Sequence, residues 1–88
     1  TSYDCSKTRE ESEQAICYVE DLAKRDVALD HLYQQQLSRV SAAQKSKLIA
    51  DQRRWMTARN KKCPIYKWWV ECLQDEYKRR MIELESLP

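Results

Sequence analysis

The absence of glycine constrains this 88-residue chain more than any other feature of its sequence. Glycine lets the backbone approach a phosphate closely or turn with a positive φ angle. A P-loop, a dinucleotide-binding fingerprint and an EF-hand loop each require it, so the sequence excludes these three kinds of site. Tight two-residue β-hairpins also lose their preferred residues. Wherever this chain turns sharply, it must do so by other means.

The spacing of apolar residues predicts an all-α fold. Three long helices are expected, over residues 20–39, 41–63 and 65–84, and no segment alternates apolar and polar residues as a half-buried strand does. Each helix carries one apolar stripe at 3.6-residue spacing. The stripes are Leu22, Leu29, Tyr33, Leu37 and Val40; Leu48, Ile49, Trp55, Met56 and Cys63; and Trp69, Leu73, Tyr77, Met81 and Leu84. The simplest arrangement is an antiparallel bundle.

Capping residues indicate where these helices begin. Thr8 and Glu11 have the spacing of a capping box, which predicts a short leading helix over residues 9–18. Ser41 is a suitable N-cap for the second long helix. Pro64 ends that helix and suits the first turn of the next one.

Four cysteines, Cys5, Cys17, Cys63 and Cys72, lie in a chain short enough to need cross-links. Their spacings do not match the close pairs of zinc ribbons. An even number favours two disulfides and an oxidising compartment, with free buried thiols as the alternative. Three connectivities remain open.

The remaining composition describes a soluble globular protein. Charged residues make up 34% of the chain and hydrophobic residues 42%, with a net charge of +2.

His31 is the single histidine, so a Cys2His2 zinc site is excluded, and we expect no metal and no cofactor. No apolar run approaches a membrane span, and no signal peptide opens the chain, as in a mature exported protein. We expect residues 1–88 to form one domain.

Four polar side chains fall on the apolar stripes: Asp26, Gln52, Arg59 and Arg80. An unpaired buried charge is costly, so these groups are expected to bond to one another. We expect an Asp26–Arg59 ion pair with Gln52 and Arg80 nearby. The alternative is that each long side chain extends to water.

An enzyme is not expected. Glycoside cleavage, for example, requires two acids that face one cleft. Asp26 is the one acid on an apolar stripe, and Glu13, Asp30 and Glu76 lie on helices where acids are usually solvated. The sequence therefore favours a binding protein.

Several short motifs occur in a characteristic order. They are Asp4-Cys5, Ile16-Cys17, Gln52-x2-Trp55-x3-Arg59-x3-Cys63 and Cys72-Leu73-x3-Tyr77-x2-Arg80. Together they resemble the LprI family of small secreted or periplasmic bacterial domains, which is named after a lipoprotein inhibitor of lysozyme. The resemblance extends from Asp4 to Leu84. It departs from the family pattern at Val19-Glu20, where an aspartate followed by proline is usual, and at Asn60, where an aspartate often stands.

The resemblance implies an all-helical, disulfide-stapled domain that is exported to the periplasm or secreted. It also implies, for some members, inhibition of a host-type lysozyme. The family's cysteines form an early and a late couple, which favours Cys5–Cys17 and Cys63–Cys72 here.

An acidic surface is the first candidate for a partner site. Residues 1–40 contain five basic and eight acidic side chains, a net charge of −3. Lysozymes are commonly basic, so an inhibitor gains from exposed acids. The candidate contact residues are Glu10, Glu11, Glu13, Glu20, Asp21 and Asp30, together with Trp68.

A basic helix face is the second candidate. Residues 41–88 contain eleven basic and six acidic side chains, a net charge of +5. The basic residues of the expected third helix, with Trp68, could hold a cell-wall polymer or another envelope protein, or form an ordinary solvated face; they are Lys45, Lys47, Arg53, Arg54, Lys61 and Lys62. Nucleic acid is not expected in an oxidising compartment. Adjacent Trp68 and Trp69 diverge by about 100°, so Trp69 is expected in the core and Trp68 either at an interface or against the first helix.

Overall fold

The computed structural model describes residues 1–87 and contains four helices. They are α1 (Glu11–Tyr18), α2 (Glu20–Arg39), α3 (Ala42–Lys62) and α4 (Trp69–Glu85). The described residues contain no strand, so the predicted all-α class is confirmed. Pro88, the last residue of the predicted domain, lies outside the described residues.

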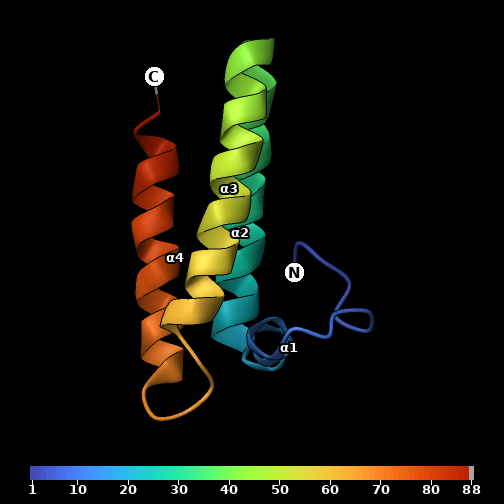
Figure 1. Ribbon diagram of the computed structural model, residues 1–88, viewed down its shortest axis with the longest axis vertical. Helices are drawn as coiled ribbons and strands as arrows, with labels where there is room; N and C mark the ends of the chain where they lie inside the picture. The colour runs from blue at the N-terminus through green and yellow to red at the C-terminus, as the bar shows by residue number, and fades with distance from the viewer. Residues whose placement is uncertain (88) are drawn as a thin grey trace.

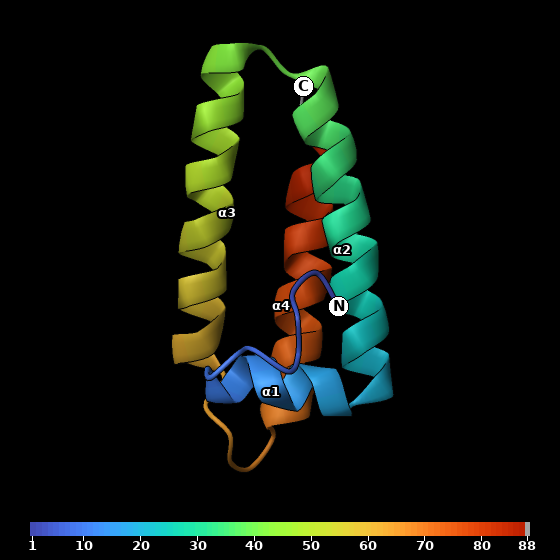
Figure 2. The same cartoon turned by 90° about the vertical axis from the view of Figure 1, so that its right-hand side faces the viewer.

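The three long helices run side by side in alternating directions, and α1 crosses one end of them (Figures 1 and 2). α2 packs mainly against α4, and α1 packs on the first turns of α2. The chain before α1 passes along the bundle between α2 and α3 (Figure 2). This arrangement buries one face of each helix.

The core consists of residues that the apolar stripes predicted, joined by one residue from α1. Its buried members are Ile16, Leu22, Leu29, Leu48, Cys63, Leu73, Tyr77 and Leu84. Tyr33, Leu37, Trp55, Trp69 and Met81 are partly buried against them. Such burial of apolar surface is the main force that holds small domains together.

Ser41 caps α3 as predicted, in a capping box with Gln44. The predicted capping box at Thr8 is wrong. α1 begins at Glu11, and the side chain of Glu10 accepts a hydrogen bond from the Ser12 amide at 3.4 Å. Thr8 instead donates its hydroxyl to Oε1 of Glu13 at 2.6 Å, because Glu13 turns towards the bundle.

The predicted start of α4 at Ile65 is also wrong, because residues 64–68 form a loop and the helix begins at Trp69. The Cys63–Cys72 disulfide holds the two Cα atoms 5.6 Å apart, so the chain must reverse direction between them. The reversal includes a left-handed residue, Trp68, with φ 68° and ψ 16°. Glycine would normally take such a position, and this chain has none.

The second disulfide joins Cys5 to Cys17 and ties the N-terminal segment to α1. Both bonds are the pairs that the family resemblance favoured, and no cysteine is free. Each disulfide joins a helix to the segment that precedes it. The Cys63–Cys72 bond closes the α3–α4 junction, whereas the chain turns at Val19 and at Val40–Ser41 without a cross-link.

Candidate functional site

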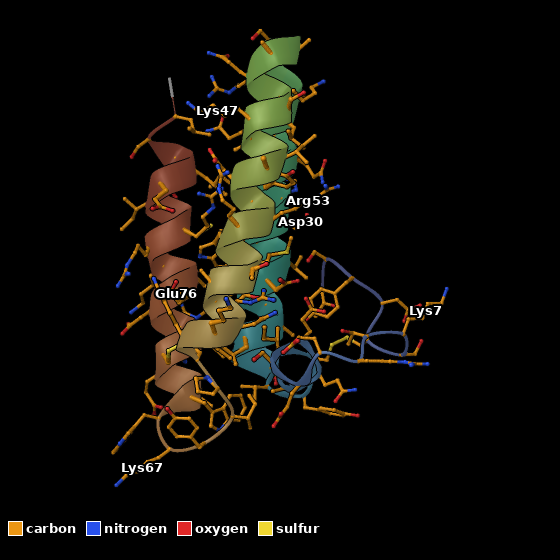
Figure 3. The ribbon with its side chains drawn as sticks, in the orientation of Figure 1. Lys7, Asp30, Lys47, Arg53, Lys67 and Glu76 are labelled. Carbon is orange, nitrogen blue, oxygen red and sulfur yellow. A yellow bond between two sulfur atoms is a disulfide. The ribbon has the colours of Figure 1, made fainter. Side chains whose placement is uncertain are left out.

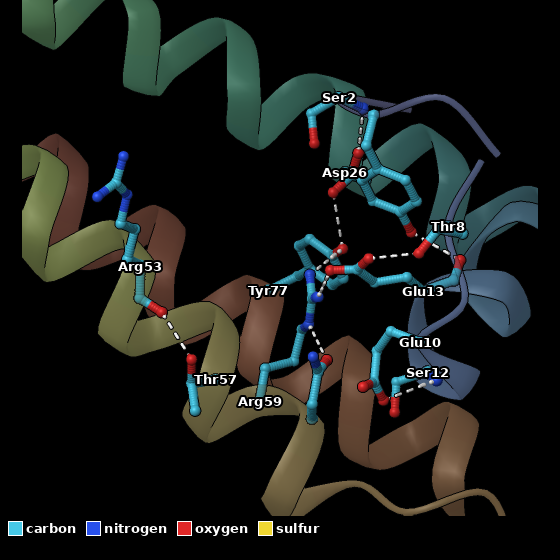
Figure 4. Close-up of polar contacts among 12 residues, drawn as sticks. Ser2, Thr8, Glu10, Ser12, Glu13, Asp26, Arg53, Thr57, Arg59 and Tyr77 are labelled. Carbon is cyan, nitrogen blue, oxygen red and sulfur yellow. Dashed lines mark hydrogen bonds and ion pairs between the residues drawn. The ribbon is translucent and has the colours of Figure 1, made fainter.

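Tyr77 is the centre of a buried polar cluster that joins all three long helices (Figure 4). Its hydroxyl donates to Oδ1 of Asp26 on α2 at 2.9 Å. The same hydroxyl accepts a hydrogen bond of 3.2 Å from Nη1 of Arg59 on α3. Because a hydroxyl can donate and accept at once, one tyrosine connects an acid and a base that lie on different helices.

Arg59 is 1% exposed, and each of its guanidinium nitrogens has a partner. Nη2 forms an ion pair of 3.3 Å with Oε2 of Glu13, which comes from α1. Nε donates to Oδ1 of Asn60 at 3.0 Å, so the residue that departs from the family pattern serves as an acceptor here. The guanidinium also lies 5.4 Å from the centroid of the Trp55 ring. Full pairing is what makes a buried arginine tolerable.

The segment before α1 covers this cluster. The amide of Ser2 donates to Oδ2 of Asp26 at 2.5 Å. The hydroxyl of Tyr3 donates to the carbonyl oxygen of Glu13 at 2.7 Å. Both carboxylate oxygens of Asp26 are therefore hydrogen-bonded, one to the bundle and one to the covering segment.

The environment of the cluster disfavours ionised tyrosine. Burial raises the pKa of Tyr77 well above its usual value, and the Asp26 carboxylate raises it further, while the Arg59 guanidinium opposes the shift. Burial followed by the Asp26 charge raises the pKa of Tyr3 in the same way. Both phenols therefore remain protonated hydrogen-bond donors at neutral pH.

A second polar contact lies between α3 and α4. Nε of Arg80 donates to Oε1 of Gln52 at 2.9 Å, and Nη1 pairs with Oε1 of Glu83 at 3.1 Å. Arg80 and Gln52 are both buried. The third nitrogen, Nη2, makes no hydrogen bond to the described residues.

The structure thus buries all four polar residues that the stripes singled out, but it corrects their expected pairing. Asp26 and Arg59 do not form the expected direct ion pair within residues 1–87. Glu13 takes the guanidinium instead, and Tyr77 stands between the two predicted partners. The physical reason is that α1 crosses the end of the bundle and brings a carboxylate that the stripes of the long helices could not reveal.

A groove of about 350 Å³ lies between α2, α3 and the N-terminal segment. Acidic and aromatic side chains dominate its lining. The lining residues are Ser2, Tyr3, Glu13, Asp26, Leu29, Asp30, Tyr33, Gln52, Trp55 and Met56. The carboxylate of Asp30 makes no hydrogen bond or ion pair to the described residues, so it is available to a cationic group from outside.

The predicted acidic residues differ in how they are bonded. Glu10, Glu11 and Glu20 are exposed at the start of α1 and of α2, where Glu10 accepts from the Ser12 amide and Glu20 pairs with Lys24 at 3.1 Å. Glu13 and Asp21 are already bonded: Glu13 to Thr8 and Arg59, and Asp21 to Arg25 at 2.7 Å and Gln74 at 2.9 Å. The hydrogen bonds from Arg25 and Gln74 lower the pKa of Asp21.

The predicted basic residues are all exposed along α3. They are Lys45, Lys47, Arg53, Arg54, Lys61 and Lys62. Arg54 pairs with Asp51 and Lys62 with Glu76, the latter at 3.9 Å. Figure 3 shows Lys47 near one end of the molecule and Arg53 nearer its middle, and Lys62 is the last residue of α3, so this charge extends along the helix.

The sequence pattern did not reveal Tyr77 as a polar centre, because a tyrosine on an apolar stripe also fits as a core ring. It also did not reveal Ser2, Tyr3 and Thr8, which lie outside any helix. One feature of the sequence could have indicated a polar role for Tyr77. It lies three residues before Arg80, on the same face of the helix as that charged side chain. A buried tyrosine hydroxyl normally needs a polar partner.

Comparison with protein families identifies the chain. The family model described as lysozyme inhibitor LprI matches residues 5–84. The chain belongs to the LprI family. No curated protein and no solved structure matches it.

The match places most of the polar cluster inside the LprI region. Both disulfides, Glu13, Asp26, Arg59 and Tyr77 lie within residues 5–84, whereas Ser2 and Tyr3 precede it. No group of three or more metal-binding side chains gathers anywhere in residues 1–87 of this LprI chain. Nor does any of its described helices have the length and hydrophobicity to cross a membrane.

Proposed function

We propose that this LprI-family protein inhibits a lysozyme by binding to it through an acidic surface. The match over residues 5–84 to a family described as a lysozyme inhibitor carries the proposal. The two disulfides support export to an oxidising compartment, where a lysozyme would be met.

The exposed acids of α1 and α2 support an electrostatic contact. Glu10, Glu11 and Glu20 are exposed, with Glu20 in a surface ion pair with Lys24, and Asp30 lines the groove without a partner among the described residues. A basic lysozyme surface would be attracted to these carboxylates, mainly through a faster association rate.

The same geometry favours binding over catalysis. Asp26 and Glu13, the acids nearest to the centre of the cluster, are both fully engaged in hydrogen bonds and an ion pair. A carboxyl group used for general acid catalysis must be able to reach the substrate. The cluster therefore serves to hold α1 and its acids in position.

A turbidity assay of lysozyme on bacterial cell walls tests the proposal. Excess protein should slow clearing, and Glu11→Gln/Glu20→Gln should weaken the inhibition. Glu71→Gln/Asp75→Asn removes the same charge from the first turns of α4 and should leave inhibition unchanged. No slowing with any of several lysozyme types contradicts the proposal, and equal loss in both variants contradicts the acidic surface.

The basic face of α3 supports a second candidate, docking to an envelope polymer or another envelope protein. Arg53 and Lys61 are exposed and form no ion pair within residues 1–87. Retention on peptidoglycan that disappears with added salt, and with Arg53→Gln/Lys61→Gln, would support this candidate. Retention that survives both changes would contradict it.

A further inference from the structure

The loop of residues 64–68 presents two large aromatic side chains to solvent at one end of the molecule. Tyr66 and Trp68 are each 67% exposed. Large apolar side chains at such exposure are unusual when they are near neighbours in one short loop. Neither ring packs against the core, whereas the neighbouring Trp69 does.

The fold itself holds these rings outward. The Cys63–Cys72 disulfide closes the base of the loop at a Cα separation of 5.6 Å, so residues 64–68 must project beyond the helix ends. Trp68 occupies the left-handed region at φ 68°, where the Cβ atom of any residue other than glycine is sterically disfavoured. That cost is consistent with a side chain retained for a contact outside the molecule.

The surroundings of the two rings are basic. Lys67 lies between them in sequence, and its ammonium is 5.6 Å from the centroid of the Trp68 ring. Lys61 and Lys62 are exposed at the end of α3, just before the loop. The sequence from residue 52 to residue 70 contains no acid, and Glu71 is the first to follow. Figure 3 shows the Lys67 side chain pointing away from the bundle.

We propose that this aromatic and basic loop docks onto an anionic phospholipid surface. Tryptophan and tyrosine have an apolar ring with a polar atom, and for that reason they favour the boundary between lipid headgroups and acyl chains. The lysines beside them match the negative charge of the headgroups. A membrane fits this site better than a protein pocket does, because the rings project from a convex tip and the charge surrounds them. The inference does not depend on lysozyme inhibition.

Co-sedimentation with lipid vesicles tests the proposal. The protein should bind vesicles of phosphatidylcholine mixed with phosphatidylglycerol, and bind pure phosphatidylcholine much less. Lys67→Gln should weaken binding about fivefold, as expected for one lysine near an anionic surface. Trp68→Ala should weaken binding at least as much.

Two matched variants at other places serve as controls. Lys47→Gln removes the same charge near the other end of α3, about 20 Å by helical rise from the end of the helix that precedes the loop, which is beyond the range of unscreened charge at physiological salt. Ile82→Ala removes a side chain that is 65% exposed on α4. Both should bind like the wild type, and circular dichroism should show that all variants are equally helical.

Three results would overturn the proposal. They are an absence of binding to the anionic vesicles at low salt, wild-type binding by Trp68→Ala, and equal weakening by Lys47→Gln and Lys67→Gln. The first result would leave a protein as the partner of the loop.

Discussion

Tyr77 and Asp26 lie 51 positions apart in sequence, and the tyrosine hydroxyl donates a 2.9 Å hydrogen bond to the aspartate. The bond joins α4 to α2, the two long helices that pack most closely. Because the same hydroxyl accepts from Arg59, the relationship also fixes α3 against this pair. A single phenol thus aligns three helices at one level of the bundle.

Replacement of Tyr77 by phenylalanine should lower the free energy of unfolding by about 1–3 kcal/mol, because Asp26 and Arg59 each lose a buried partner. Urea denaturation measures the change. Tyr66→Phe removes a hydroxyl from an exposed ring and should change stability by less than about 0.5 kcal/mol. An unchanged midpoint for Tyr77→Phe would contradict its central role.

Arg59→Met should be more damaging, by roughly 3–5 kcal/mol, because it leaves the Glu13 carboxylate without its cation beside Asp26. The matched control is Lys61→Met. It also removes a positive charge, but from an exposed side chain two positions after Arg59. Thermal and urea unfolding of both variants measure the difference. Similar stability of the two variants would show that the buried pairing is unimportant.

Each disulfide should contribute about 2–3 kcal/mol, the value of the chain-entropy model for loops of this size. The sequence separations of 12 for Cys5–Cys17 and 9 for Cys63–Cys72 are similar, so similar losses are expected. Variants in which each pair is replaced by alanine, compared by urea denaturation, test this expectation. Mass mapping of the unreduced protein should give the same two pairs.

Trp68→Gly should be more stable than Trp68→Ala by about 1 kcal/mol, because only glycine takes a positive φ angle without steric cost. Both variants lose the indole, so the comparison isolates the backbone. The same pair of substitutions at the helical position Ile82 should show the opposite order. Equal stability at position 68 would mean that the backbone there is not held in the left-handed region.

Alkaline pH should weaken the folded state through Tyr77 and Tyr3. Burial raises the pKa of both phenols in the folded protein, while unfolded tyrosine ionises at about pH 10. The folded state therefore holds these protons more tightly, and its stability is full below pH ~10 and falls as pH rises further. Unfolding free energies measured on both sides of pH ~10 should show a shallower fall for Tyr77→Phe. Parallel curves would contradict the shift.

Local patterns predicted much of the fold because they depend on near neighbours. The bounds of α2 and the cap at Ser41 follow from apolar spacing and from a serine that satisfies the first amides of its helix. The start of α4 did not follow from the sequence. Pro64 suits a helix start, but the disulfide between Cys63 and Cys72, nine residues apart, reverses the chain there instead. The Thr8 cap failed for a similar reason, since Glu13 provided a stronger acceptor.

The candidate site was predictable in its members but not in its connections. Asp26, Arg59, Gln52 and Arg80 were recognisable because a charge on an apolar stripe is conspicuous within a single helix. Their partners come from other helices or from the N-terminal segment. Glu13, for example, had the appearance of a surface acid and proved to be the partner of Arg59.

The sequence by itself determined the all-α class, the faces that each helix buries and the need for turns without glycine, since helical period and backbone freedom are properties of the chain itself. Only the tertiary structure decided that Tyr77 separates Asp26 from Arg59 and that the 64–68 loop projects Tyr66 and Trp68. Both outcomes depend on how helices cross and where a disulfide closes. The first arises from packing between helices whose residues are up to 51 positions apart, and the second from a cross-link over nine residues that overrides the helix-forming pattern between them.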